Sequence, residues 1–420
     1  MLLMRRELRP EVPDDRLLDA LLTTEVAFAA DAENLTSLEG QSALVGAIGL
    51  TARSGAQCYL DVPNVDLPGV TAPLTSPLLV DGLLDLGLDL IPGRSFEPRL
   101  PAHEVDLAVV LGDSRWRGLA RRIVRLSGDA WRGRIAPQGE RWTPRGSPFG
   151  ALASSGLAAG EAYKAAMRRL GDWAPGREVF DALFADALVA EVALAPPGTP
   201  APTRDLGHFD FVSGGAIIHA ALYALSRIPR ATAHARVIEP ESNELSNVNR
   251  YWFLRSSRLE EKKATHLASL DLGDLRITAV PRLYCDRNLN EIGPLAHRVL
   301  VGVDHIPSRW AVQQARPSWL GIGATSDHFV QVTFHSAGLC CACCLHPDGM
   351  EAPRKIPTVA FVSHWAGLWL ASIFARVASG LEVPRVHQQT TMWTLRPDSR
   401  SAIQQSQGVS TSTCELRCPL

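Results

Sequence analysis

Short apolar runs alternate with glycine turns and helical stretches in the second half of the chain. An apolar run at residues 208–212 leads into the turn Ser213-Gly214-Gly215, and a helical pattern follows over residues 216–228. A second apolar run, 235–238, ends on Glu239. This order predicts a β-α-β unit like those of nucleotide-binding sheets. With further strands expected at 275–280, 298–303, 319–323 and 328–333, the pattern indicates an α/β fold with a largely parallel sheet.

The first half of the chain repeats this order in weaker form. The pattern predicts helices at residues 41–54 and 146–170, and strands at 56–60 and 105–111. Three pairs of landmarks, 178, 191 and 188 residues apart, follow the same order: Asp61 and Glu239, Asp113 and Asp304, and Trp131 and Trp319. We therefore predict a degenerate internal repeat of two Rossmann-like halves.

A proline-rich stretch separates the two halves. Residues 195–204 contain four prolines and one glycine, a composition that suits neither a helix nor a central strand. We predict a first domain at residues 1–195, a linker at 196–207 and a second domain at 208–420.

Composition and charge exclude several classes of protein. The chain has 420 residues, is 46% hydrophobic and carries 42 basic and 44 acidic side chains, for a net charge of -2. This balance gives no basic footprint for nucleic acid or an anionic membrane. No apolar run approaches the ~20 residues of a membrane helix, and the N-terminus lacks a signal-peptide pattern. A cytoplasmic protein with reduced cysteines is expected.

The segment from Glu239 to Lys263 carries the candidate chemistry. At the end of its strand, Glu239 could accept hydrogen bonds from ribose hydroxyls. Asn247 and Arg250 lie three residues apart and would share one face of a helical turn, and the planar, charged guanidinium of Arg250 suits phosphate oxygens. Lys263 could add a second cation. Only four residues in the whole chain are lysine, so a lysine at this place is informative.

These motifs resemble those of the ThiF/MoeB and ubiquitin-activating-enzyme superfamily of adenylyltransferases. The family's acidic pair, its S-N-[LV]-x-R motif and its Lys-Ala pair appear as Glu239-Pro240-Glu241, Ser246-Asn247-Val248-Asn249-Arg250 and Lys263-Ala264. Its T-D-N-x-x-x-R, P-x-x-x-G and C-x-x-C-L segments correspond to residues 303–309, 317–321 and 341–345. The resemblance is specific over residues 208–350, and the first half resembles the inactive adenylation half of two-half activating enzymes in outline.

The resemblance implies that the second half binds ATP. Arg250 and Lys263 would steady the phosphates, and Asp304 would hold Mg²⁺ and act with them in catalysis, because attack on the α-phosphate builds negative charge. The nucleotide-contacting residues would be Ser213, Gly214, Gly215, Glu239, Asn247, Arg250, Lys263 and Asp304.

The glycine turn departs from the family pattern. Ser213, Ala216 and Ile218 stand where the family has glycine, and Tyr251 stands where glutamine is usual. We expect the β-branched Ile218 to restrict the close packing of the helix that glycine allows.

Six of the eight cysteines form two groups. Cys341-x-x-Cys344 and Cys414-x-x-x-Cys418 could make a tetrahedral Zn²⁺ site, and the resemblance implies a structural zinc there. Cys340 and Cys343 form an alternative first pair with the same spacing. Ubiquitin-activating members carry a nucleophilic cysteine in the segment that corresponds to residues 346–364, which holds none here. The candidates for such a thiol are Cys285, Cys340 and Cys343.

The sequence therefore predicts two Rossmann-like adenylation-fold halves, of which the second is active. It would use ATP and Mg²⁺ to adenylate the C-terminal carboxylate of a ubiquitin-like protein, with a conjugating enzyme as a second candidate partner. Because the pseudo-dimer is internal, the chain need not form a homodimer, and the sequence leaves the oligomeric state open. Within the same chemistry, the substrate could instead be a sulfur carrier of molybdopterin or thiamine synthesis or a peptide matured by adenylation. The alternatives of other classes are a non-catalytic scaffold that binds a ubiquitin-like tail and a dinucleotide-dependent oxidoreductase. The last has no use for the Ser-Asn-Val-Asn-Arg segment or the zinc cysteines.

Overall fold

The first half of the chain forms a six-stranded mixed sheet. The computed structural model describes residues 3–90, 96–336, 358–381, 388–397 and 403–407. The first sheet has the order β2-β1-β3-β4-β5-β6, with β1 to β4 parallel and β5 and β6 antiparallel. Its strands are β1 (Glu25–Ala29), β2 (Gln57–Asp61), β3 (Leu107–Leu111), β4 (Ile123–Gly128), β5 (Arg132–Ala136) and β6 (Ala190–Ala193).

The second half forms an eight-stranded sheet of the order β14-β13-β12-β11-β10-β7-β8-β9, in which the strands from β11 to β9 run parallel. The strands are β7 (Asp205–Val212), β8 (Thr232–Ile238), β9 (Leu275–Val280), β10 (Arg298–Val301), β11 (Trp319–Ser326), β12 (Phe329–Ser336), β13 (Gln388–Trp393) and β14 (Ile403–Gln407). The predicted α/β class with largely parallel sheets is confirmed. Residues 205–207, predicted as linker, instead open β7, because Leu206 is buried and this proline-free stretch pairs with the start of β8.

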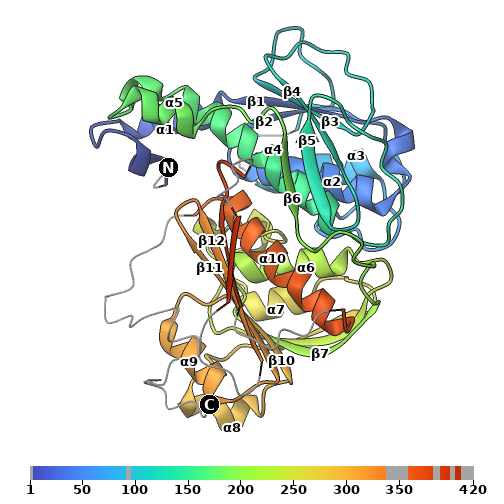
Figure 1. Cartoon of the computed structure of the whole chain (residues 1–420), viewed down its shortest axis with the longest axis vertical. Coiled ribbons are helices and arrows are strands. Elements are labelled where there is room, and N and C mark those ends of the chain that lie inside the picture. Colours follow the sequence, from blue (N-terminus) through green and yellow to red (C-terminus); the bar gives the residue numbers. More distant parts are fainter. Residues whose placement is uncertain (1–2, 91–95, 337–357, 382–387, 398–402, 408–420) are drawn as a thin grey trace.

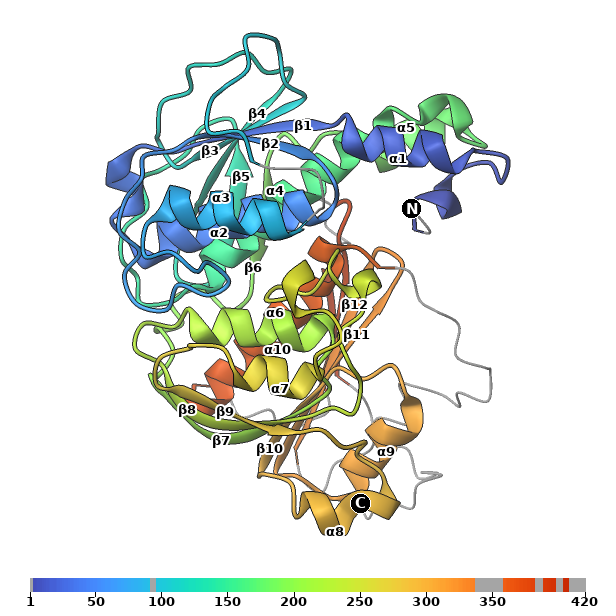
Figure 2. The same cartoon turned by 180° about the vertical axis from the view of Figure 1, so that it is seen from behind.

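The helices of the first half are α1 (Asp14–Leu22), α2 (Leu38–Arg53), α3 (Leu79–Leu90), α4 (Phe149–Arg168) and α5 (Arg177–Leu183). Those of the second half are α6 (Ala216–Ser226), α7 (Lys263–Ala268), α8 (Leu289–Ile292), α9 (Ile306–Gln314) and α10 (Ala360–Ala378). Between the sheets, α2 and α4 of the first half face α6 and α10 of the second (Figures 1 and 2). Short 3₁₀ helices occur at Met4–Glu7, Ala32–Leu35, Gly171–Trp173, Leu245–Asn247, Ser256–Arg258 and Asp286–Asn288.

The two sheets share one topology, which supports the predicted repeat. The order β2-β1-β3-β4-β5-β6 corresponds to β8-β7-β10-β11-β12-β13, and in both sheets the antiparallel part begins at the fifth of these strands. One landmark pair was matched wrongly. Trp131 precedes β5, whereas Trp319 opens β11, the counterpart of β4. The two stretches look alike because Gly133 and Gly321 both lie under a packed helix: a Cβ there would come within 2.6 Å of Ala153 and 2.7 Å of Leu370, respectively.

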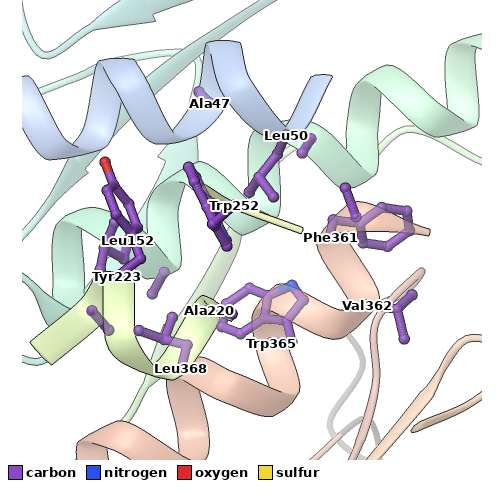
Figure 3. Close-up of a cluster of buried hydrophobic side chains, with 14 of the residues drawn as sticks. Ala47, Leu50, Leu152, Ala220, Tyr223, Trp252, Phe361, Val362, Trp365 and Leu368 are labelled. Carbon is purple, nitrogen blue, oxygen red and sulfur yellow. The ribbon is translucent and has the colours of Figure 1, made fainter. Parts of the chain in front are cut away.

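The interface between the halves is a hydrophobic core built from α2, α4, α6 and α10 (Figure 3). Trp252 stacks on Tyr223 with ring centroids 4.1 Å apart, and Leu50, Leu152 and Trp365 line the same cluster. Helices covered on both sides are apolar all round, which is why α4 and α10 show little amphipathic pattern and lie almost wholly buried.

Helix α10 is a long apolar helix, although we expected no apolar run near the length of a membrane helix. At 19 residues it is long and apolar enough to cross a membrane by length and composition alone, yet 94% of its most apolar window is buried inside the protein. Its burial against α6, α4 and β11 gives it the character of a core helix.

Candidate nucleotide site

A pocket of about 390 Å³ lies at the carboxyl ends of β7, β8 and β10. Strand β7 has β8 on one side and β10 on the other, so the chain leaves it at a switch point of the parallel sheet, the usual ligand position in such folds. Six of the predicted nucleotide residues line the pocket: Ser213, Gly215, Glu239, Arg250, Lys263 and Asp304. They come from distant parts of the sequence, and the fold brings them together.

The glycine turn keeps a tight backbone although Ser213 replaces a glycine. Ser213 has φ 135°, in the region that favours glycine, and its Oγ accepts a hydrogen bond of 2.9 Å from the N–H of Gly215. Gly214 has no room for a side chain, because a Cβ there would lie 2.9 Å from the Cβ of Lys263 and 3.0 Å from the Cγ of Glu239. The turn therefore presses directly against two of the pocket's charged residues.

The expectation that Ile218 would restrict helix packing is wrong. Ile218 is fully buried, and glycines on the facing elements make room for it and for Ile217. A Cβ on Gly302 would come within 3.1 Å of Ile218, and one on Gly323 within 2.9 Å of Ile217. The small residues that allow the close approach of helix and sheet thus lie on the strand side of this contact.

Glu239 is buried and binds the main chain around it. Its Oε2 accepts a hydrogen bond of 2.8 Å from the N–H of Gly214, and its Oε1 accepts one of 3.0 Å from the N–H of Glu241. Each carboxylate oxygen keeps one further lone pair for a ligand hydroxyl. Glu239 therefore ties the end of β8 to the glycine turn, a structural role that the sequence did not reveal.

Two cations gather around the ring of Tyr251. The Nζ of Lys263 and the Cζ of Arg250 each lie 5.6 Å from its ring centroid, and Lys263 also pairs with the exposed carboxylate of Glu241. Burial alone would lower the pKa of Lys263, but Tyr251 and the nearby carboxylates raise it above its ordinary value. Lys263 is therefore charged at neutral pH and available to an anionic ligand.

On the side of His219, the ring of Tyr251 faces an uncharged group. The ring of His219 lies 4.6 Å from that of Tyr251, and its burial in α6 holds its pKa well below the usual range. Burial also raises the pKa of Tyr251, so the phenol stays protonated. The pocket thus presents positive charge over uncharged rings, a surface that suits phosphate oxygens.

Asn247 shapes the turn before Arg250, and its contact with a nucleotide stays a prediction. It is absent from the described residues that line the pocket. Its Oδ1 accepts a hydrogen bond of 3.0 Å from the N–H of Glu244, and the Glu244 side chain caps the N–H of Asn247 in return. This reciprocal cap shapes the 3₁₀ turn that precedes Arg250.

Asp304 is exposed in the pocket just beyond the end of β10. Within the described part of the chain, its carboxylate has no hydrogen bond or ion pair. Mg²⁺ is held by one or two carboxylates together with substrate phosphates, and a free carboxylate at this position fits that requirement. The guanidinium of Arg309, on which the charge of Asp304 acts, donates to the carbonyl of Val303 at 2.8 Å.

Besides the apolar Leu283, four polar pocket residues were not identified from the sequence: Tyr284, Thr325, Thr358 and Ser363. Thr325 follows shortly after the glycines of β11, so its position could have been inferred from that motif. Thr358 and Ser363 lie at the start of α10, and only the fold brings them to the nucleotide turn. Cys285 directly follows Tyr284 and is half-buried. Cys340, Cys341, Cys343, Cys344, Cys414 and Cys418 lie outside the described residues, so the zinc site stays a prediction.

The corresponding place in the first half is filled by its own side chains. Asp113, the counterpart of Asp304, accepts a hydrogen bond of 2.7 Å from the Nδ2 of Asn34. The Oδ1 of Asn34 accepts one of 2.9 Å from the N–H of Trp142. Asn34 is buried and occupies the space beyond β1 where the second half has its glycine turn. In this half the carboxylate that corresponds to Asp304 is therefore bound by the protein's own side chains.

Comparison with known proteins gives three kinds of match. Residues 25–183, from β1 to α5, match the family of the BilD N-terminal domain. A stretch of 150 residues is 33% identical to the uncharacterized protein y4jF of Sinorhizobium fredii. This stretch is 34% of this chain and 29% of that protein. The chain thus aligns with less than a third of that relative's length.

The chain also matches several solved structures at low sequence identity. Escherichia coli MccB with MccA-N7isoASN is 13% identical, with a TM-score of 0.41 over 50% of this chain and 67% of that chain. MccB with succinimide is 12% identical, with a TM-score of 0.41 over 70% and 96%. PaaA is 10% identical, with a TM-score of 0.37 over 48% and 72%. At these TM-scores the overlays assign no residue of this chain.

Proposed function

We propose that this protein uses ATP to adenylate the C-terminal carboxylate of a ubiquitin-like protein. The observation that supports this most is the single pocket that collects a tight glycine turn, two cations and a free carboxylate. The N-terminus of α6 adds main-chain N–H groups and a positive dipole end at the same place. Adenylation needs these groups together, because it brings the triphosphate of ATP, a divalent cation and the carboxylate of the substrate to one place.

The reaction is a displacement at the α-phosphate of ATP. A carboxylate oxygen of the substrate forms a bond to the α-phosphorus while the bond from that phosphorus to the bridging oxygen breaks. Pyrophosphate leaves with the electron pair, and an acyl-adenylate remains. Arg250 and Lys263 would hold the phosphates in line for this displacement, and Asp304 would hold Mg²⁺, whose charge offsets that of the transition state. Glu239 would keep the turn in place and accept from the ribose.

The protein nature of the substrate is part of the proposal. Carboxylate activation by a chain with two linked halves resembles the activation of a modifier more than that of a sulfur carrier, whose enzymes usually pair two identical halves. A conjugating enzyme would then receive the activated tail. A scaffold that binds the tail without turnover is the second candidate, favoured by the strained Ser213 turn.

ATP–pyrophosphate exchange with a ubiquitin-like protein encoded near this chain tests the proposal. Exchange should require the intact C-terminus of that protein and should be lost in Asp304→Asn. Asp19→Asn is the matched control, because Asp19 is an exposed aspartate of α1, far from the pocket in sequence. Binding of both ATP and the protein without any exchange would reject the enzyme and favour the scaffold.

A further inference from the structure

The segment that carries Arg250 and Tyr251 into the pocket has little regular structure of its own. Between the 3₁₀ turns at Leu245–Asn247 and Ser256–Arg258 the backbone consists of turns and irregular stretches. Residues 251–254 are nevertheless buried. Buried carbonyls that no helix or sheet satisfies need donors from elsewhere, since an unpaired one is costly.

Arg53 supplies these donors from the first half. It is the last residue of α2 and is only 5% exposed. Its Nη2 donates to the carbonyls of Trp252 at 2.8 Å and Leu254 at 3.0 Å, and its Nη1 donates to the carbonyl of Val248. The three acceptors lie on both sides of Arg250 and Tyr251 in the sequence. One guanidinium therefore fixes both ends of the short stretch that faces the nucleotide.

Other bonds from the first half fix the same segment further along. Arg255 donates to the carboxylate of Asp85 and to the carbonyl of Pro73, both at 2.9 Å. The N–H of Ser257 donates to Asp89 at 2.9 Å. Side chains and carbonyls of the first half therefore hold this part of the second half's site in place.

We propose that Arg53 is a positioning residue for the nucleotide site: it holds residues 248–254 so that Arg250 and Tyr251 face the phosphates. The expected effect on the KM for ATP rests on the proposed function. The expected effect on the order of residues 248–254 does not depend on it. Within the described residues Arg53 pairs with no carboxylate, and it interacts instead with three carbonyls. A planar fork of fixed donors can do this, whereas the single nitrogen of lysine cannot serve three separated acceptors.

Two further observations support this role. Burial lowers the pKa of Arg53 to about 9, so the side chain is still charged at neutral pH and keeps all its donors. Arg53 also lines a pocket of about 300 Å³ on the other side of the segment, which the neighbouring Asn249 lines as well. The shortened side chain of Arg53→Ala would leave room there for a small guanidinium ion.

Arg227 provides a matched control. It too is a buried arginine, 4% exposed, that joins the halves, through its Nε to the Oγ of Ser42 at 2.9 Å and its Nη1 to the carbonyl of Val70. It caps the C-terminal end of α6, whereas the pocket lies at the N-terminal end. Its loss should weaken the interface without moving the nucleotide segment.

The experiment compares Arg53→Met, Arg53→Lys and Arg227→Met in the full chain, with Arg53→Ala added for rescue by guanidinium. In Arg53→Met, amide hydrogen exchange of residues 245–258 should become at least about tenfold faster, the factor expected for one lost charge-assisted hydrogen bond. In Arg227→Met it should stay near the wild-type rate. The KM for ATP in pyrophosphate exchange should rise by a similar factor in Arg53→Met and Arg53→Lys, with kcat changed less, and stay within about twofold in Arg227→Met. Guanidinium chloride below its denaturing range should partly restore the KM of Arg53→Ala.

The outcomes separate the two proposals. Equal hydrogen exchange of residues 245–258 in Arg53→Met and the wild type would overturn the positioning role, whatever the activity. Equal changes in hydrogen exchange and in the KM for ATP in Arg53→Met and Arg227→Met would show that Arg53 stabilises the interface without a specific effect on the nucleotide site. A wild-type protein without pyrophosphate exchange, in which Arg53→Met still loosens residues 245–258, would reject adenylation and keep the structural role of Arg53.

Discussion

A Cβ on Gly367 of α10 would lie 2.5 Å from the Cβ of Ala220 in α6. The two helices therefore meet with their backbones in direct contact. Helix α6 begins at the glycine turn and α10 begins beside the pocket, so this crossing sets the position of two pocket walls relative to each other. The geometry of the site depends on packing some distance from it.

Gly367→Ala should destabilise the protein although alanine favours helices. The clash with α6 should cost about 1–3 kcal/mol, as overpacking of a core does, and should outweigh the gain of about 1 kcal/mol in helix propensity. Gly160→Ala in α4 is the control, since its nearest neighbour would be 3.7 Å from the new Cβ. It should be neutral or stabilising in urea denaturation. Equal stability of both variants would show that α6 and α10 can separate without cost.

Tyr251→Leu should weaken ATP binding more than Tyr251→Phe. Both cations lie near the ring face, and each cation–π contact is worth about 0.5–2 kcal/mol, so loss of the ring should raise the Kd for ATP by roughly tenfold. Phenylalanine keeps the ring and should stay within about threefold. Isothermal titration with ATP measures both variants. A Kd for Tyr251→Phe as weak as that of Tyr251→Leu would assign the effect to the hydroxyl.

Glu239→Gln should destabilise the fold before any ligand is added. A glutamine offers one acceptor oxygen to two main-chain donors, so either Gly214 or Glu241 loses its hydrogen bond at a cost of about 1–3 kcal/mol. Glu241→Gln is the comparison, because it removes the ion pair with the buried Lys263 but leaves both main-chain hydrogen bonds of Glu239 in place. The free energy of unfolding without nucleotide should fall more in the first variant than in the second. The reverse order would contradict the structural role of Glu239.

The sequence predicted the pieces of this fold better than their arrangement. The strand ends at Glu239 and Asp304 and the turn at Ser213 were found because polar residues interrupt apolar runs there. The contact of Arg53 with the segment around Arg250 was not found, because the two lie about 200 positions apart in the sequence and no local pattern marks such a contact. The prediction that Ile218 restricts helix packing was wrong for the same reason. The space for its side chain is left by Gly302, which only the folded sheet brings beside it.

Acid should destabilise the interface through a buried histidine of α10. His364 lies against α4, where its Nε2 pairs with the carbonyl of Leu152 at 2.9 Å, and burial lowers its pKa to about 4 from 6.5. The unfolded chain therefore takes up this proton between pH 6.5 and 4, while the folded protein does not, so stability falls as the pH falls through this window. The loss from this one group should be about 2 kcal/mol between pH 7 and pH 5.

His364→Gln should remove that part of the pH dependence. The difference in unfolding free energy between pH 7 and pH 5 should shrink by about 2 kcal/mol relative to the wild type. Ser372→Ala on the same helix removes a buried hydroxyl that bonds to the carbonyl of Trp369, and it should lower stability equally at both pH values. An unchanged slope in His364→Gln would mean that the histidine titrates alike in the folded and unfolded states.

The zinc prediction concerns residues beyond the described part of the chain and has a direct test. A site formed by Cys341, Cys344, Cys414 and Cys418 predicts about one Zn²⁺ per chain, measured by elemental mass spectrometry of the purified protein. Cys344→Ser should lose the metal, because removal of one of four thiolates opens a structural site. Cys58→Ser, which changes a buried thiol of β2, should keep it. Loss of zinc in Cys340→Ser but not in Cys344→Ser would assign the first pair to Cys340 and Cys343, and a metal-free wild type would leave these cysteines as reduced thiols.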